Sequence, residues 1–302
     1  MKDKKIIFIG CVEFSNFFLK EMLNNKVNVI GVCTKKKSKF KSDFSNLSLL
    51  AKDRKIPYIF WDKNTDEKKI FDWISEKKPD YIFCIGWPQL LKKKILQIPK
   101  YFCVGFHPSD LPHNRGRHPI IWSIILNFKK IASTFFIMSE YADNGLILLK
   151  NKISLKKNET SQTLFDKLFL ISKKQIPHLL KKISALGHKK NSYEFLFKNN
   201  QLSNSLRKRD KNDGIIDWRM SAKNIDALIR ALSKPYDGAC FYHKNRLYKV
   251  LQSKVYKSKN QLEPGKIINK LKNNLIIQTG ENLIELSKII PKIKIKKGDY
   301  LQ

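Results

Sequence analysis

Short β-rich segments alternate with amphipathic helical segments over the first part of the chain, and this alternation limits the possible folds more than any other feature. The β-rich residues 4–10 are followed by a helical pattern with apolar residues three and four positions apart and Ser15 as the expected N-cap. The succession of strand and helix is repeated at residues 27–34, 57–62 and 79–87. Alternation at this spacing is typical of βαβ units. We therefore expect an α/β fold with a Rossmann-like, mostly parallel sheet and flanking helices.

The alternation of strand and helix patterns ends at about residue 190. A charged segment, "SLRKRDKNDG", is followed by one helical pattern and then by short alternating strands with turns at "EPGK", "KNN" and "KKGDY". Many short strands with regular turns are typical of a small β-barrel. We expect a domain of residues 1–190, a linker of residues 191–212 and a small OB-like β-barrel domain of residues 213–302.

The strand ends carry candidate binding residues without a dinucleotide fingerprint. After the first strand, "GCVEFS" has one glycine where G-x-G-x-x-G needs three, and the chain has no G-x-x-x-x-G-K-[ST] sequence. A nicotinamide or flavin dinucleotide site is therefore not expected. Because strand ends in such sheets face ligand crevices, we expect Ile85, Gly86 and Trp87 to lie at the lip of a binding site.

The charge of the chain is strongly positive. Among its 302 residues, 60 are lysine or arginine and 26 are aspartate or glutamate, which gives a formal net charge of +34. Only eight of the 60 are arginine, the residue that nucleic-acid readers favour. Lysine as a compositional surface residue and affinity for a phosphorylated or nucleic-acid substrate both stay open. No apolar segment approaches the ~20 residues that span a bilayer, and no signal peptide is evident, so we expect a cytoplasmic protein.

Residues 105–119, "GFHPSDLPHNRGRHP", hold three of the six histidines of the chain together with three prolines and two arginines. Prolines prevent a regular helix, and ionisable groups on a rigid irregular loop are typical of a working site. A histidine that titrates near neutrality suits proton transfer. Further on, Asp143 lies in a tight turn after a strand-like segment, where a carboxylate can orient such a histidine.

The order of these motifs resembles the folate-dependent formyltransferase family. "FHPSDLP", "RGRHPIIW" and "STFFIMSEYADNG" match its histidine loop and the setting of its downstream aspartate, and "NDGIIDW" with "IRALSKPYDGA" resembles its join to a C-terminal barrel. These motifs look closer to the sugar N-formyltransferases than to the related methionyl-tRNA formyltransferases. The resemblance implies that residues 1–190 are a formyltransferase catalytic domain, that 10-formyltetrahydrofolate is the formyl donor, and that no metal takes part.

The resemblance also implies an acceptor. We expect the formyl group to pass to the amine of a nucleotide-linked amino sugar, as in the biosynthesis of cell-surface polysaccharides. Two alternatives stay open. One is formylation of methionyl-tRNA, for which the positive charge and the barrel would hold tRNA. The other is a catalytically silent, nucleic-acid-binding relative. The sugar, the nucleotide and the oligomeric state are left open.

Carried over residue by residue, the resemblance makes His107 the catalytic histidine and Asp143 the catalytic aspartate. Arg115 and Arg117 are expected either to bind a substrate anion or to anchor the loop. We expect His243 at the surface. The residues expected to bind the folate lie on the strand end and on the histidine loop, and are Ile85, Gly86, Trp87, Ser109, Asp110, Leu111 and Pro112.

One position departs from the family in a way that concerns the chemistry. The catalytic asparagine of the family falls at Gly105 in this chain. That asparagine would donate a hydrogen bond to the developing oxyanion, and a lost oxyanion donor costs roughly 3–4 kcal/mol when nothing replaces it. We expect protonated His107, a main-chain N–H group or a water to polarise the formyl oxygen, and we expect the protein to be active.

Overall fold

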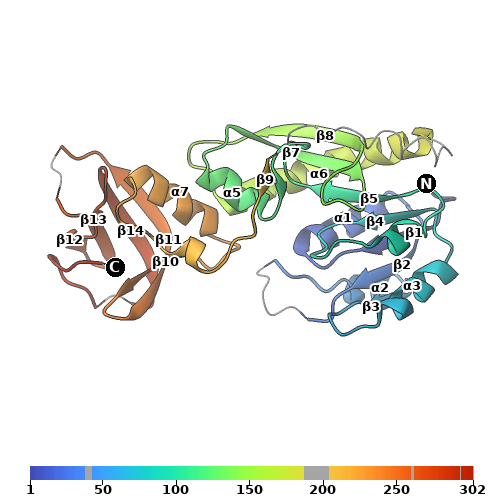
Figure 1. Cartoon of the computed structure of the whole chain (residues 1–302), viewed down its shortest axis with the longest axis horizontal. Helices are drawn as coiled ribbons and strands as arrows, with labels where there is room; N and C mark the ends of the chain where they lie inside the picture. The colour runs from blue at the N-terminus through green and yellow to red at the C-terminus, as the bar shows by residue number, and fades with distance from the viewer. Residues whose placement is uncertain (38–42, 187–203, 260–261, 293, 302) are drawn as a thin grey trace. The chain divides into compact units, whose positions relative to one another are not determined.

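The computed structural model describes residues 1–37, 43–186, 204–259, 262–292 and 294–301 (Figure 1). The chain divides into two compact units, each made of three segments. The first contains Met1–Gly116, Ile131–Ile153 and Lys167–Ser205, and the second contains Arg117–Lys130, Ser154–Asp166 and Leu206–Gln302. The domain limits expected from the sequence stay a prediction, and residues 191–203 of the expected linker lie outside the described residues.

A seven-stranded sheet forms the centre of the first unit, with the order β3-β2-β1-β4-β5-β7-β8. Strands β1 to β5 are parallel, whereas β7 runs antiparallel to β5. The mostly parallel sheet expected from the alternating pattern is thus confirmed. The strands are β1 (Ile6–Ile9), β2 (Val29–Thr34), β3 (Tyr58–Phe60), β4 (Tyr81–Cys84), β5 (Phe102–His107), β7 (Lys130–Ile137) and β8 (Ile147–Ser154).

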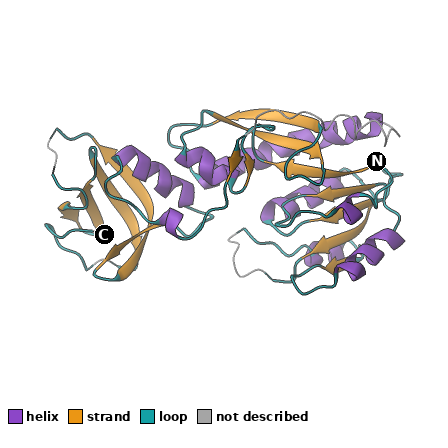
Figure 2. Cartoon of the chain, viewed as in Figure 1, coloured by secondary structure: helices purple, strands orange, loops and turns teal. Residues whose placement is uncertain are grey.

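Helices cover both faces of this sheet (Figure 2). Residues of α1, α2 and α6 pack into one hydrophobic core, and residues of α3 and α4 pack into the other. None of the helices in the described part of the chain is long and apolar enough to cross a membrane. The helices are α1 (Glu13–Asn24), α2 (Ser48–Asp53), α3 (Glu67–Glu76), α4 (Lys93–Leu96), α5 (Pro119–Ile125) and α6 (Ser161–Leu186).

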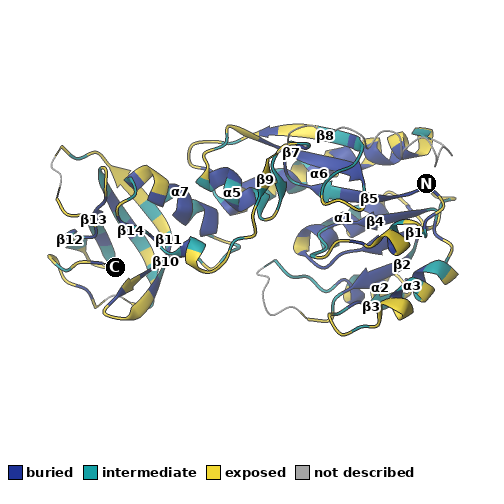
Figure 3. Cartoon of the chain, in the orientation of Figure 1, coloured by how far each residue is buried: buried dark blue, intermediate teal, exposed yellow. Residues whose placement is uncertain are grey.

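Strand β1 shows why the sequence specifies this layered arrangement. Ile6 and Phe8 enter the core that α1, α2 and α6 cover, while Ile7 and Ile9 enter the core that α3 and α4 cover. All four side chains are fully buried, and Figure 3 colours the ribbon of the chain by this burial. A parallel strand between two helical layers needs apolar residues on both faces, so the uninterrupted sequence "IIFI" fits a central position.

Ser15, the expected N-cap of α1, lies inside the first turn of that helix, so this expectation was wrong. The helix begins at Glu13, with Val12 in the N-cap position. The Ser15 hydroxyl accepts a hydrogen bond from the Val12 amide at 3.2 Å and donates one to the Ile85 carbonyl at 2.5 Å. Ser15 therefore joins the start of α1 to the segment that follows β4.

The C-terminal part of the second unit contains α7 (Ala222–Leu232) and an antiparallel sheet with the order β10-β11-β14-β13-β12. The expected antiparallel C-terminal sheet is confirmed, and among the described residues it ends in the edge strands β10 and β12. His243, which we expected at the surface, is buried, and its Nδ1 lies 3.1 Å from the Tyr300 carbonyl oxygen. The strands are β10 (Ala239–His243), β11 (Arg246–Tyr256), β12 (Ile267–Leu271), β13 (Asn274–Gln278) and β14 (Leu283–Ile290).

Two short strands form a separate two-stranded sheet. Strand β6 (Arg115–Gly116) pairs with β9 (Ser205–Leu206), although the two are far apart in the sequence. The irregular loop expected after β5 therefore contains a strand, and α5 begins shortly after it.

Candidate active site

His107 ends strand β5, and its side chain is almost fully buried. Its Nδ1 lies 3.6 Å from Oδ1 of Asp143, and its Nε2 lies 3.4 Å from the carbonyl oxygen of Asn114. The structure thus brings together the two residues expected to be catalytic. Both ring nitrogens face oxygen acceptors, so a neutral ring can donate to one of them and a protonated ring to both.

Asp143 lies in the aspartate turn, residues 139–145, between β7 and β8. Its backbone has φ of 52°, and its Oδ2 accepts a hydrogen bond from the Gly116 amide at 3.0 Å. The following residue is held as well, because Asn144 Oδ1 accepts a hydrogen bond from Arg115 Nη2 at 3.1 Å. The carboxylate is therefore fixed by a main-chain donor of strand β6.

Gly145 allows the aspartate turn to approach β7 closely. A Cβ atom at this position would lie 1.7 Å from the carbonyl oxygen of Ile137. No side chain fits at that distance, so any other residue would move the turn away from the strand. The glycine that follows Asp143 and Asn144 in the sequence is thus a requirement of the site geometry.

The protonation of His107 is controlled by opposing effects. Burial lowers the pKa of the imidazole below its usual value of 6.5, while the Asp143 carboxylate and the Asn114 carbonyl act in the opposite direction. The net effect is a lowered pKa, so the ring is neutral near pH 7. A neutral imidazole can take up a proton, which is the property that a general base needs.

The SDLP loop, residues 109–112, is tied to the neighbouring strands by side chains. Thr134 on β7 donates a hydrogen bond to the Ser109 carbonyl at 2.7 Å. Lys150 on β8 contacts Oδ1 of Asp110 at 2.7 Å and the Leu111 carbonyl at 2.9 Å. Leu111 is buried, and the bond between Leu111 and Pro112 is cis.

Two lysines determine the charge state of Asp110. Lys150 lies 2.7 Å from its carboxylate and the more exposed Lys152 lies 3.4 Å from it. Partial burial acts to raise the pKa of the Asp110 carboxyl, but the hydrogen bonds and charges of the two lysines outweigh it, so the pKa is lowered. With two ammonium groups and one carboxylate, this cluster has a net positive charge.

The residues expected at the lip of the site follow β4. Cys84 pairs with Gly105 in the sheet, so Ile85, Gly86 and Trp87 continue the chain beside the end of β5. Ile85 is fully buried. The Trp87 ring lies 5.2 Å from that of Trp61 and 5.2 Å from Nζ of Lys35. The Trp87 Nε1 is buried and, among the described residues, has no hydrogen-bond partner.

Gly105 lies on β5 opposite Phe136 of β7. A Cβ atom at position 105 would lie 2.8 Å from Cζ of Phe136 and 2.9 Å from Cγ of Met138. Two apolar side chains therefore fill the space where the family has its asparagine. Neither side chain can donate a hydrogen bond at this position.

The two arginines of the loop differ in their surroundings. Arg115 is half-buried and uses Nη2 to bind Asn144, and its buried Nε has no hydrogen-bond partner among the described residues. Arg117 is exposed and belongs to the second unit, where its amide donates to the Leu206 carbonyl at 2.9 Å. Arg115 thus contacts the aspartate turn through Asn144, and the two roles expected for it stay predictions.

Several contacts of the site were not predicted from the sequence. The Asn114 carbonyl, the Gly116 amide and the Lys150 side chain all contact residues that were predicted. The first two are main-chain groups, which leave no side-chain signal in a sequence. Lys150 is one lysine of many in this chain, and its role depends on the pairing of β7 with β8.

Comparisons with known proteins identify the class of protein that this fold and this histidine–aspartate pair define. The family model "Formyl transferase" matches residues 4–180, and "Formyl transferase, C-terminal domain" matches residues 208–301. The chain belongs to the formyl transferase family, and the enzyme class expected from its motifs is confirmed.

Similar proteins support this assignment at two levels. The chain is 30% identical to the methionyl-tRNA formyltransferase of Clostridium beijerinckii over 291 residues, which is 94% of the chain and 91% of that relative. An N-formyltransferase from Helicobacter canadensis, solved with folinic acid and dTDP-3-aminofucose, matches with a TM-score of 0.67 and 19% identity over 94% of the chain and 98% of that protein. HypX from Aquifex aeolicus, solved with tetrahydrofolic acid, matches with a TM-score of 0.66 and 12% identity over 95% of the chain, which spans 44% of HypX.

Proposed function

We propose that the chain transfers a formyl group from 10-formyltetrahydrofolate to the amine of a nucleotide-linked amino sugar. The observation that carries the chemistry is the buried pair of His107 and Asp143, 3.6 Å apart, with the carboxylate held by a main-chain amide. Such an arrangement suits a reaction in which one proton leaves an amine while a new bond forms.

His107 is the general base in this proposal. When Nδ1 carries the proton of the neutral ring and faces Asp143, Nε2 is unprotonated and can accept a proton. The resulting imidazolium then has an acceptor for each N–H group, because Nε2 faces the Asn114 carbonyl. Asp143 and the Asn114 carbonyl therefore stabilise the imidazolium once it has formed, although burial lowers the pKa of the ring and favours its neutral form.

His107 alone is enough for the proton transfer that the reaction requires. The acceptor nitrogen forms the new bond to the formyl carbon, the bond from that carbon to the donor nitrogen breaks, and one proton passes from the acceptor to the leaving nitrogen. His107 can accept this proton from the acceptor nitrogen and then donate it to the leaving nitrogen. Since Gly105 provides no side-chain donor for the formyl oxygen, that task falls in this proposal to a main-chain N–H group, a water or the protonated ring.

The residues expected to bind the folate fit a flat heterocycle with polar edges. The Trp87 indole has a buried N–H without a partner among the described residues, and the end of β4 beside it offers main-chain groups. The SDLP loop supplies a rigid wall next to His107, tied down by Thr134 and Lys150. When bound, 10-formyltetrahydrofolate would supply the activated formyl group.

Two observations favour an amino sugar as acceptor. Over 94% of the chain, the fold matches an N-formyltransferase whose structure was solved with dTDP-3-aminofucose. Arg115, which lies directly behind the aspartate turn, keeps a guanidinium N–H without a partner among the described residues, and phosphate or carboxylate oxygens are suitable acceptors for such a group.

A specific observation also favours methionyl-tRNA as a second candidate. A methionyl-tRNA formyltransferase is 30% identical to this chain over nearly the whole of both sequences. The net charge of +34 suits a polyanionic substrate. The same buried histidine–aspartate pair would serve either acceptor, because both present a primary amine.

An acceptor panel tests the proposal. The full-length chain is incubated with 10-formyltetrahydrofolate and nucleotide-linked 3-amino or 4-amino sugars, and with methionyl-tRNA in parallel, and products are followed by mass spectrometry. Formylation of a sugar, at a rate well above that of methionyl-tRNA, is the expected result. Formylation of methionyl-tRNA with no sugar product would transfer the assignment to the second candidate.

A further inference from the structure

We propose that Asn204, which directly precedes strand β9, is a positioning residue for the catalytic pair. This inference rests on the roles proposed for His107 and Asp143. Asn204 is exposed, and it forms hydrogen bonds with Asn114 and Arg115. It acts through Asn114, which lies in the segment of residues 105–119, far from Asn204 in the sequence.

The contact between Asn204 and Asn114 is reciprocal. The Asn114 amide donates a hydrogen bond to Oδ1 of Asn204 at 2.8 Å, and Nδ2 of Asn204 donates one to Oδ1 of Asn114 at 2.6 Å. One side-chain amide thus binds both the backbone and the side chain of the residue whose carbonyl oxygen faces Nε2 of His107.

The strand pairing extends this contact along the loop. The Arg115 amide donates to the Asn204 carbonyl at 3.3 Å, and the Arg117 amide donates to the Leu206 carbonyl at 2.9 Å. Between them, the Gly116 amide points to Oδ2 of Asp143. The amides on either side of Gly116 thus bind the segment around β9, while the Gly116 amide holds the Asp143 carboxylate.

The loop needs such support because its own conformation is unusual. Asn114 has φ of 57° and Gly116 has φ of 99°, so two left-handed residues flank Arg115. A short segment with this backbone gains few hydrogen bonds within itself. The four hydrogen bonds to residues 204–206 fix the two groups that face the catalytic pair, namely the Asn114 carbonyl and the Gly116 amide.

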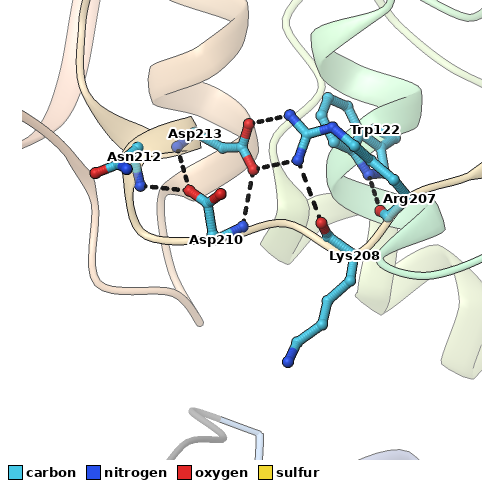
Figure 4. A network of polar contacts seen from close by, with 6 residues as sticks. All are labelled: Trp122, Arg207, Lys208, Asp210, Asn212 and Asp213. Carbon is cyan, nitrogen blue, oxygen red and sulfur yellow. Dashed lines mark hydrogen bonds and ion pairs between the residues drawn. The ribbon is translucent and has the colours of Figure 1, made fainter.

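The chain that follows β9 is itself anchored within the second unit (Figure 4). Trp122 on α5 donates a hydrogen bond from Nε1 to the Arg207 carbonyl at 2.9 Å, and the Arg207 guanidinium lies 5.1 Å from the Trp122 ring. The same guanidinium pairs with Asp213, and the Asp210 amide donates to the Asp213 carboxylate at 2.8 Å. These contacts fix Arg207 to α5, the helix that follows β6.

The kinetic test replaces Asn204 in the full-length chain. Asn204→Ala removes both side-chain hydrogen bonds, and we expect kcat to fall about tenfold with KM for donor and acceptor within threefold, because small misplacements of reacting groups reduce the rate. Asn204→Asp keeps an acceptor for the Asn114 amide, and Asn114 can rotate its own amide group to donate, so most of kcat should return. Asn24→Ala, an exposed asparagine on α1 of the same unit, is the matched control and should change neither parameter.

A second readout needs no substrate. The titration of His107 is followed by NMR in the wild-type chain and in Asn204→Ala. Release of the Asn114 carbonyl, which supports the charged ring, should shift the midpoint to lower pH, and Asn204→Asp should restore it. An unchanged midpoint, or a kcat above half of the wild-type value in Asn204→Ala, would overturn the positioning role. A shifted midpoint in a chain that formylates no sugar would support this inference while refuting the proposed acceptor.

Discussion

The two segments that flank His107 keep their shape by different means. The SDLP loop is tied by side chains of neighbouring strands, with Thr134 and Lys150 bound to its carbonyl groups. The aspartate turn depends on a main-chain donor at Gly116 and on the close approach of Gly145 to β7. A side-chain tether can be removed alone, whereas a close backbone contact cannot be relieved without moving the turn. We therefore expect changes in the aspartate turn to cost more activity than changes around the SDLP loop.

The largest effects should come from the pair itself. His107→Ala and Asp143→Asn should each lower kcat by about 10²–10⁴-fold, because the first removes the base and the second removes its orienting carboxylate. Folate binding, followed by fluorescence titration or calorimetry, should stay within a few fold of wild type. A variant that keeps more than about a tenth of wild-type kcat would exclude that residue from the assigned role.

Gly145→Ala should have the next largest effect. The added methyl group would lie 1.7 Å from the Ile137 carbonyl oxygen, so the turn must shift and carry Asp143 away from His107. We expect kcat to fall about 10²-fold, together with a lower Tm. Gly214→Ala is a matched control, since its nearest neighbours would lie 3.3 Å away, at Arg209 and Leu232. Near-normal turnover in Gly145→Ala would show that the aspartate turn can adjust.

Gly105→Asn tests the apolar filling of the asparagine position. The new side chain would meet Phe136 and Met138 at less than 3 Å from its Cβ atom, and overpacking of this kind costs about 1–3 kcal/mol. We expect lower stability in urea and a kcat reduced about tenfold, with partial recovery when Phe136→Ala is added to make room. A rise in kcat in the single variant would mean that the site lacks an oxyanion donor and that the asparagine supplies it.

Removal of the side-chain tethers of the SDLP loop should have a smaller effect, on KM and not on kcat. Lys150→Met removes hydrogen bonds to Asp110 and to the Leu111 carbonyl, and we expect KM for the formyl donor to rise about fivefold to tenfold with kcat nearly unchanged. Lys152→Met is the matched comparison, because Lys152 is more exposed and lies 3.4 Å from the carboxylate. In Lys152→Met, KM for the formyl donor should stay within twofold of the wild-type value. Equal effects of Lys150→Met and Lys152→Met on this KM would refute the tethering role of Lys150.

The smallest effect concerns pH. Because burial lowers the pKa of folded His107 below 6.5, the acidic limb of kcat/KM should have its midpoint below pH 6.5. The folded state binds fewer protons than the unfolded chain as the pH falls below 6.5, so stability should decrease in that range. In Asp143→Asn, NMR titration of His107 should show a still lower midpoint, since the carboxylate that supports the charged ring is gone. A midpoint above 6.5 in the wild-type chain would contradict the dominance of burial.

The sequence predicts the first-unit sheet and the proximity of His107 to Asp143, because both depend on patterns of side chains that a sequence displays. The apolar residues of β1 alternate between two cores, and the "ADNG" segment predicts a tight turn that carries a carboxylate. It does not predict Asn114, Gly116 or Asn204, because their contacts depend on main-chain groups and on a strand pairing between distant residues. His243 was missed for a related reason, since its burial depends on the packing of the C-terminal strands and not on local sequence.

The pairing of β6 with β9 has a consequence for how such chains can be recombined. In a chimera of two related chains, the sequence alone suggests residue 190 as the junction, since the formyltransferase match ends at residue 180 and the C-terminal match begins at residue 208. A chimera joined there would nevertheless inherit β9 from a different parent than β6. Exchange of C-terminal domains should therefore preserve the native partner of β6 only when the crossover falls after residue 206.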